Sequence, residues 1–187
     1  MFRSLLPLLI AALPGIYMPV IAAAEEQLAL FSADGYRQTQ YRSPTPATAE
    51  GAQTLDTSAL QTLLAKEPNV VLVDVYRSQW LAGRFIDSEP HANLPGSLWL
   101  ANTGDGDLQP QWASYFSDNL ARASQGNLER PIVFYCRSDC WLGWNATRRA
   151  HALGYKKLYW YRDGVDGWEQ AGLPLHPATP EPLPGDD

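Results

Sequence analysis

Three short apolar runs set the hydrophobic pattern in the middle of the sequence. Residues 70–75 and 132–135 are almost uninterrupted runs of aliphatic and aromatic side chains, and residues 158–161 form a third, more aromatic one. Such runs are typical of strands that are buried on both faces, as in a parallel sheet between helices. Residues 97–100 are a weaker strand candidate after the turn at Pro95-Gly96.

Helical periodicity fills the segments between these runs. The first predicted helix is capped by Asp56 or Thr57, and the second spans residues 110–124. The third carries one apolar stripe and ends at Gly154; its stripe consists of Leu142, Ala146, Ala150 and Leu153. Strands that alternate with helices predict an α/β sandwich with a mainly parallel sheet.

The two ends of the sequence depart from this pattern. Residues 1–24 contain one Arg, an apolar run and a final Ala22-Ala23-Ala24, which predicts a cleaved secretory signal peptide. An uncleaved membrane anchor is the alternative, although prolines interrupt the run. We expect residues 25–51 to form an extended lead-in, residues 52–175 the folded domain, and residues 176–187 a disordered tail rich in proline and acidic residues.

Composition excludes several classes of function. The chain has 187 residues, of which 45% are hydrophobic, and its net charge is −6. The negative charge argues against a protein that binds nucleic acid through phosphate contacts. Two Cys and three His are too few for a closed zinc site without carboxylates, so we expect no metal and no cofactor. A metal site built from both cysteines and one histidine is the less favoured alternative.

The candidate chemistry lies in residues 136–141, which join a predicted buried strand to a predicted helix. Open α/β sheets bind ligands at this edge, and the amides of a helix start favour a thiolate. Cys136 is therefore the candidate nucleophile and Cys140 its partner thiol. The candidate substrate-binding residues beside them are Arg137, Ser138, Asp139 and Trp141. A structural disulfide is the alternative, but so short a loop gains little stability from cross-linking.

This segment resembles the loop of the rhodanese-like domain, where a catalytic Cys opens a Cys-Arg-x-Gly-x-Arg sequence between a strand and a helix. Cys136-Arg137-Ser138 matches the opening of that loop. Three further segments resemble family motifs in the expected order: Val73-Asp74-Val75 (Asp-Val-Arg), residues 91–97 (Gly-His-Ile-Pro-Gly-Ala), and Asp163-Gly164-Val165 with Trp168 and Gly172-Leu173-Pro174 (Gly-Gly-x-x-x-Trp…Gly-x-Pro).

The resemblance covers residues 52–174. It implies a three-layer sandwich with a mainly parallel five-stranded sheet and helices on both faces, in which Asp74 is a structural support. Asp139 stands where the family has Gly, Cys140 adds a thiol, and Trp141 stands where Arg is common. This Cys-x-x-x-Cys-Trp version is similar to a subfamily of exported bacterial proteins associated with PQQ-dependent alcohol catabolism, which implies a periplasmic location.

Three functions remain open. Cys136 either carries sulfur as a persulfide in a sulfurtransferase, or cycles with Cys140 as a redox dithiol. The partner is then a small sulfur-containing substrate or a periplasmic protein thiol. In the third hypothesis the domain is a non-catalytic binding module for a quinoprotein or cytochrome, with Trp141 and Trp144 facing the ligand. A Cys-x5-Arg phosphatase is excluded, because Leu142 stands at the Arg position. Neither His91 nor His151 is a strong general-base candidate.

Overall fold

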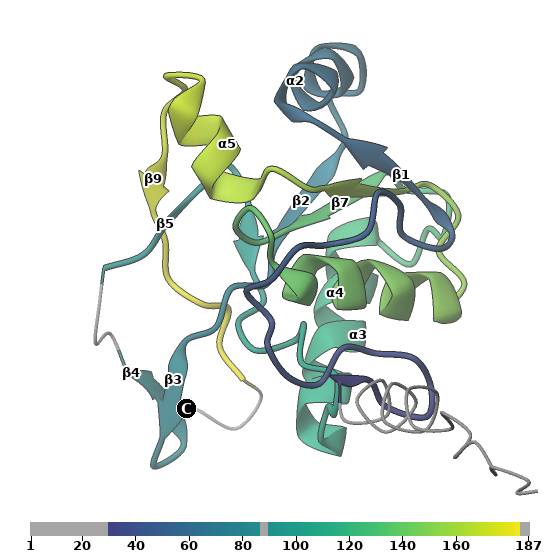
Figure 1. Cartoon of the computed structure of the whole chain (residues 1–187), viewed down its shortest axis with the longest axis vertical. Helices are drawn as coiled ribbons and strands as arrows, with labels where there is room; N and C mark the ends of the chain where they lie inside the picture. Colours follow the sequence, from purple (N-terminus) through teal and green to yellow (C-terminus); the bar gives the residue numbers. More distant parts are fainter. Residues whose placement is uncertain (1–29, 87–89, 184–187) are drawn as a thin grey trace, which may run out of the picture.

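The computed structural model describes residues 30–86 and 90–183, and a parallel sheet forms its centre (Figure 1). The strand order is β1-β8-β7-β2-β6, and every neighbouring pair in this sheet is parallel. The five strands are β1 (Ala52–Leu55), β2 (Val71–Asp74), β6 (Leu98–Trp99), β7 (Ile132–Tyr135) and β8 (Leu158–Tyr161). The three predicted apolar runs are thus the parallel neighbours β2, β7 and β8.

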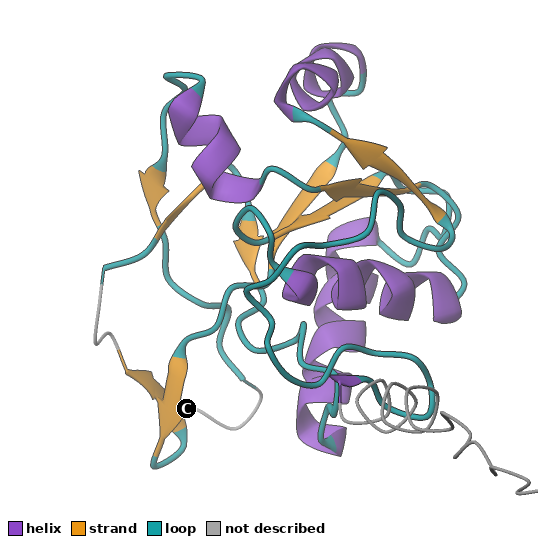
Figure 2. Cartoon of the chain, viewed as in Figure 1, coloured by secondary structure: helices purple, strands orange, loops and turns teal. Residues whose placement is uncertain are grey.

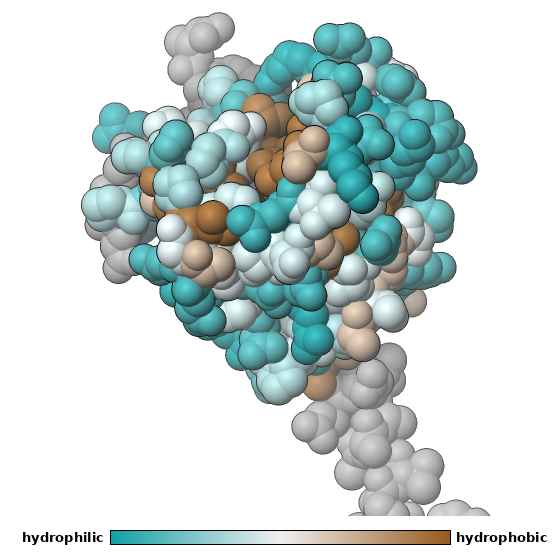
Figure 3. All heavy atoms as spheres, turned by 90° about the horizontal axis from the view of Figure 1, so that it is seen from above, coloured by the Kyte–Doolittle hydropathy of each residue, from teal (hydrophilic) through white to brown (hydrophobic). Residues whose placement is uncertain are grey.

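Helices cover both faces of the sheet (Figures 1 and 2). On one face lie α2 (Thr57–Lys66) and α5 (Gly164–Gln170), and on the other α3 (Pro110–Ser124) and α4 (Trp141–Ala152). The α/β sandwich with a five-stranded parallel sheet is therefore confirmed. Seen from the side of α2 and α5, the surface is mostly hydrophilic with smaller apolar areas (Figure 3).

The central strand β7 explains why the core has two halves. Its side chains alternate between faces, and all four are fully buried. Ile132 and Phe134 pack into the cluster on the α3 and α4 side, whereas Val133 and Tyr135 pack into the cluster with α2 and α5. Both faces of the strand are excluded from water, which is why its sequence is an unbroken apolar run.

Several short elements were not predicted. The edge strand β1 contains the polar pair Gln53-Thr54, so its pattern lacks the apolar run of a central strand. Two hairpin strands, β3 (Gln79–Leu81) and β4 (Arg84–Ile86), form a separate small sheet. Helix α5 starts at Gly164, where the sequence predicts only a turn.

The prediction of a disordered tail from residue 176 is wrong as far as Leu183. Strand β9 (His176–Pro177) pairs with β5 (Ala92–Asn93) in an antiparallel sheet. Glu181 then donates its backbone N–H to the carbonyl of Trp99, and Leu183 is only 7% exposed. Proline prevents regular structure but not packing, so an apolar side chain and a few backbone hydrogen bonds hold this segment.

The described part of the lead-in, residues 30–50, lies across α4; we call it the strap (Figure 1). The Arg37 N–H donates to Oδ1 of buried Asn145 at 2.9 Å, and Nδ2 of Asn145 donates to the Arg37 carbonyl at 2.8 Å. The predicted signal peptide lies outside the described residues. In the ranges that are described, no helix has the length and hydrophobicity needed to cross a membrane.

Candidate functional site: the Cys136–Cys140 loop

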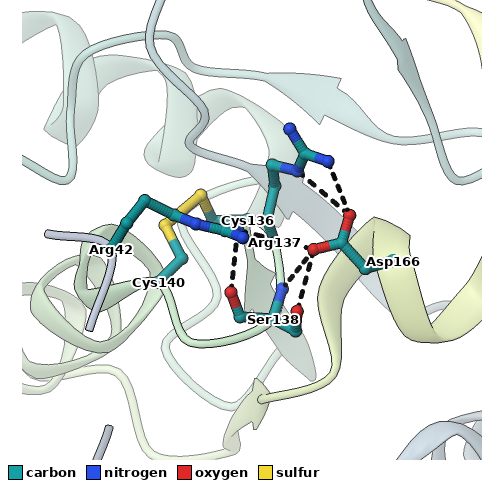
Figure 4. A network of polar contacts seen from close by, with 6 residues as sticks. All are labelled: Arg42, Cys136, Arg137, Ser138, Cys140 and Asp166. Carbon is teal, nitrogen blue, oxygen red and sulfur yellow. Dashed lines mark hydrogen bonds and ion pairs between the residues drawn. A yellow bond between two sulfur atoms is a disulfide. The ribbon is translucent and has the colours of Figure 1, made fainter. Parts of the chain in front are cut away.

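The loop of residues 136–140 connects the carboxyl end of β7 to the start of α4 (Figure 4). Cys136 and Cys140 form a disulfide whose Cα atoms are 6.2 Å apart. Both residues are buried, with 2% and 3% of their surface exposed. The structure therefore brings together the two thiols singled out in the sequence and holds them in the oxidised form. Nucleophilic chemistry at Cys136 requires prior reduction of this bond.

Asp139 replaces the glycine of the family loop, yet it adopts a left-handed backbone with φ of 47°. Asp is one of the few residues that tolerate this conformation, so the loop can turn here without a glycine. The Asp139 carbonyl accepts a hydrogen bond from the Ser43 N–H at 3.1 Å. The turn at Asp139 is thus held by a backbone hydrogen bond from the strap.

Asp166 of α5 is the site residue that the sequence analysis missed (Figure 4). Nε and Nη2 of Arg137 donate to its Oδ1 at 3.0 and 2.9 Å. The N–H and Oγ–H of Ser138 donate to its Oδ2 at 3.1 and 2.8 Å. The only signal in the sequence was its place inside the motif that ends at Trp168. One carboxylate therefore fixes both the charged side chain and the backbone of the loop.

Electrostatics at Asp166 follow from these contacts. Partial burial raises the pKa of the carboxyl, but the hydrogen bonds from Arg137 and Ser138 outweigh it, so the pKa lies below its ordinary value. The hydrogen bonds to Asp166 in turn raise the pKa of Arg137. The positive charge expected to bind a substrate anion is thus already paired within the chain.

Gly164 allows α5 to approach the loop this closely. Its φ is +59°, and a Cβ built there would lie 2.6 Å from Cα of Arg137 and from the Cys136 carbonyl oxygen. The next N–H, that of Val165, donates to the same Cys136 carbonyl at 3.0 Å. This contact anchors the first residue of the loop to the first turn of α5.

The strap pairs with the other side of the loop. Arg42 and Cys140 form an antiparallel bridge, in which the Trp141 N–H donates to the Tyr41 carbonyl at 2.9 Å. Nη1 of Arg42 also donates to the Ser138 carbonyl at 2.8 Å. The strap therefore covers Cys140 and helps to bury the disulfide.

The sequence predicts that the amides of the helix start favour a thiolate at Cys136. Its sulfur is bonded to Cys140 instead. The Ser138 N–H is taken by Asp166, and the Trp141 N–H by Tyr41 of the strap. Both acceptors, Asp166 of α5 and Tyr41 of the strap, lie outside the loop, so the loop sequence does not reveal them.

Trp141, a candidate substrate-binding residue, is packed against the strap in this structure. It is 7% exposed, and its Nε1–H donates to Oγ of Ser43 at 3.0 Å. The Phe31 ring packs edge-on at 5.4 Å between centroids, and the Arg37 guanidinium lies 4.9 Å from the indole centroid. Trp141 thus joins α4 to the strap. Trp144 likewise donates to the strap, at the Thr48 carbonyl.

Asp74, the predicted structural support, lies fully buried at the end of β2. Its Oδ2 is 2.6 Å from Nε2 of His91, and its Oδ1 accepts the Tyr76 N–H at 2.9 Å. Burial raises the pKa of Asp74, while His91 opposes the shift. The His91 ring also stacks on Tyr76 at 5.0 Å. His91 thus fixes the segment after β4 to the sheet edge, a pairing that the two family motifs did not reveal.

The remaining candidates do not form a second centre. His151 is exposed near the end of α4. Among residues 30–86 and 90–183, no cluster of three or more His, Cys, Asp or Glu side chains is arranged to hold a metal ion.

Several solved structures are similar to this chain. The thiosulfate sulfurtransferase of Pseudomonas aeruginosa is 16% identical, with a TM-score of 0.50, and the match covers 71% of this chain but only 21% of that one. The polysulfide-sulfur transferase homodimer of Wolinella succinogenes is 18% identical (TM-score 0.45, covering 67% and 79%). A human single-domain sulfurtransferase is 25% identical (TM-score 0.43, covering 64% and 96%).

The present chain thus corresponds to about a fifth of the length of the Pseudomonas aeruginosa protein. A search among curated proteins finds no match. The family model of the rhodanese-like domain matches residues 56–171, a segment that contains the sheet strands β2, β6, β7 and β8 and the cysteine loop. Because this match covers more than half of the chain, the protein belongs to the rhodanese-like domain family.

Proposed function

We propose that this protein is a sulfur-transfer protein in which Cys136, once reduced, accepts a sulfane sulfur as a persulfide. The observation that carries the proposal is the position of Cys136. It follows the central strand β7, within the family match, in the loop that resembles the catalytic loop of the family, and its sulfur is bonded to that of Cys140. The names of the similar structures, sulfurtransferases of thiosulfate and polysulfide, support the same chemistry.

The step balances with thiosulfate as the donor. The Cys136 thiolate attacks the sulfane sulfur, and a new S–S bond forms on Cys136. The bond between the two sulfur atoms of thiosulfate breaks, and its electron pair leaves with sulfite. The persulfide then passes its outer sulfur to an acceptor thiol. Small donors are favoured, because both cysteines are nearly buried.

The setting of this chemistry is part of the proposal. The signal-peptide pattern of residues 1–24 supports export, and a disulfide between Cys136 and Cys140 suits an oxidising compartment such as the periplasm. The Cys-x-x-x-Cys-Trp sequence supports a role accessory to PQQ-dependent alcohol catabolism, with a quinoprotein or cytochrome as partner. Amino-terminal sequencing of the mature protein tests export, since the first residue is then Glu25.

Single-thiol variants test the sulfur transfer. The reduced Cys140→Ser variant is incubated with thiosulfate and, separately, with inorganic polysulfide. Intact mass is expected to increase by one sulfur atom, and the matched Cys136→Ser variant is expected to gain none. Absence of the extra sulfur on Cys140→Ser with both donors, while small alkylating reagents still label its thiol, would overturn the proposal.

A non-catalytic binding module is the second candidate. The observation that favours it is that Ser138 and Trp141 use their N–H groups within the chain and Arg137 is paired with Asp166. In that case the disulfide is structural. Failure of both single-thiol variants to acquire sulfur then leaves this candidate in its place.

A further inference from the structure

We propose that Cys140 resolves the Cys136 persulfide and releases its outer sulfur as sulfide. This rests on the proposed function, because it needs a persulfide on Cys136. The Cys140 thiolate attacks Sγ of Cys136, the Cys136–Cys140 bond forms, and the bond to the outer sulfur breaks. The outer sulfur gains two electrons and leaves as hydrosulfide, and the two cysteines lose those electrons. The activity is the reduction of sulfane sulfur.

The geometry of the disulfide carries this step. The Cα atoms lie 6.2 Å apart, within the range of about 4.4–6.8 Å that disulfides require. The bond coexists with the hydrogen bonds of the loop at both ends: Val165 to Cys136, and Trp141 to Tyr41. The two sulfur atoms therefore meet while the loop keeps its folded hydrogen bonds, and no unfolding step separates the persulfide from its resolution.

The start of α4 supports the role of Cys140 as the resolving thiol. Cys140 is the N-cap residue of α4, and the first turn of α4 contains no acidic residue. The positive end of the helix dipole therefore stabilises a thiolate at Cys140 as well, so Cys140 can attack once Cys136 carries the outer sulfur. Cys136 lies at the end of a strand, four residues before the cap. Cys136 therefore carries the outer sulfur, and the Cys140 thiolate attacks Sγ of Cys136 to release that sulfur as hydrosulfide.

Burial favours this internal attack over transfer to an outside thiol. Cys136 is 2% exposed, and the strap covers the Cys140 side of the loop through the Arg42 bridge. An external acceptor must displace these contacts, whereas Cys140 is already in place. Holding two reactants together replaces a bimolecular step by an intramolecular one, which is faster by orders of magnitude at ordinary thiol concentrations.

The cycle closes only with an external dithiol reductant. The dithiol, either a small molecule or a protein, reduces the Cys136–Cys140 bond by thiol–disulfide exchange and is itself oxidised to a disulfide. The net reaction converts a sulfane-sulfur donor and a dithiol into sulfide, a disulfide and the remainder of the donor. With thiosulfate, that remainder is sulfite. Sulfite thus measures loading of Cys136, and sulfide measures its resolution.

A single-turnover experiment separates the two steps. Reduced, desalted full-length protein is mixed with thiosulfate without oxygen, and sulfite, sulfide and intact mass are followed. The wild type is expected to release equal amounts of sulfite and sulfide and to lose the mass of two hydrogen atoms. Cys140→Ser is expected to release sulfite, keep the extra sulfur, and release sulfide at least about 10-fold more slowly until a dithiol is added.

The outcomes distinguish the inference from the function on which it rests. A wild type that keeps the extra sulfur and releases no sulfide overturns the role of Cys140 but leaves sulfur transfer intact. A Cys140→Ser variant that forms neither sulfite nor persulfide, with polysulfide as well, overturns sulfur transfer itself. Cys140→Ala is run in parallel, and circular dichroism compares both variants with the reduced wild type, which also lacks the disulfide.

Discussion

At the scale of single residues, Asp166 determines how the cysteine loop is held. Its two oxygens accept four hydrogen bonds from Arg137 and Ser138, and its side chain is only 17% exposed. Charge-assisted hydrogen bonds are stronger than neutral ones, and this carboxylate binds backbone and side chains together. The loop therefore depends on a residue of α5 as much as on its own sequence.

Substituting Asp166 with Ala is expected to lower the free energy of unfolding by about 1–3 kcal/mol, because the Ser138 N–H and the Arg137 guanidinium lose their acceptor. Urea denaturation measures the change. Asp118→Ala is the matched control, since Asp118 is exposed on α3 and is expected to cost less than about 0.5 kcal/mol. Equal losses in the two variants would contradict the role of Asp166.

The same carboxylate predicts a pH dependence. The pKa of Asp166 is lower in the folded protein than its ordinary value. Its stabilisation is therefore complete above about pH 5 and is lost as the pH falls toward the folded pKa. The difference in unfolding free energy between wild type and Asp166→Asn is expected to shrink from about pH 5 to about pH 3. A difference that stays constant over this range would show that the ionised form is not what holds the loop.

At the scale of elements, the first turn of α5 and the cysteine loop form one packing unit. Gly164→Ala is expected to destabilise the protein by more than about 2 kcal/mol and to shift the loop, because it adds both an unfavourable φ and a clash with Arg137 and Cys136. Gly172→Ala is the control. Gly172 has a φ of +71°, but nothing lies within 4 Å of its Cβ position.

Thermal unfolding measures the stability lost in the Gly164→Ala and Gly172→Ala variants. The rate at which a reductant opens the Cys136–Cys140 disulfide shows whether the loop has shifted. Gly172→Ala carries only the backbone cost, about 1 kcal/mol, and is expected to leave the rate unchanged. If the two variants lose the same stability and reduce at the same rate, the close approach of α5 contributes nothing to the loop.

Elements were predictable where burial alone determines the pattern. The runs that became β2, β7 and β8 are buried on both faces. Three residues of the predicted stripe, Leu142, Ala146 and Ala150, are buried in the core, whereas the fourth, Leu153, is 45% exposed. The hairpin strand β3 has two exposed residues of three, so its sequence carries little hydrophobic signal. Helix α5 has only seven residues, too few for a periodic pattern to stand out.

The sequence predicts the parts of the candidate site that lie close together along the chain, but not the contacts between distant residues. Cys136 and Cys140 are four positions apart, and a strand–loop–helix pattern brings them to one edge of the sheet. The contacts of Asp166 with Arg42 join residues far apart in the sequence, and no local pattern encodes them. Trp141 is a candidate for ligand contact because it begins a helix beside the thiols. Its neighbours in the structure include Phe31 and Arg37 of the strap, which no local sequence pattern reveals.

At the scale of the whole molecule, the folded unit extends beyond the family match of residues 56–171. The strap packs on α4 before it, and the segment from β9 to Leu183 packs after it. Tyr115 of α3 donates its hydroxyl hydrogen to the Glu181 carbonyl at 2.7 Å, which fixes the segment around Glu181 against the core. Both flanking segments therefore belong to the stable structure.

A substitution at Leu183 tests whether the segment from β9 to Leu183 contributes to the stability of the fold. Leu183 is 7% exposed and packs with the α3 and α4 side of the core, so Leu183→Ala is expected to cost about 2–3 kcal/mol of unfolding free energy. Leu81→Ala is the matched control, because Leu81 is 58% exposed in the hairpin and is expected to cost less than about 0.5 kcal/mol. Urea denaturation compares the two. A loss at Leu183 as small as that at Leu81 would mean that this segment contributes nothing to the core, and the family domain alone would then account for the stability.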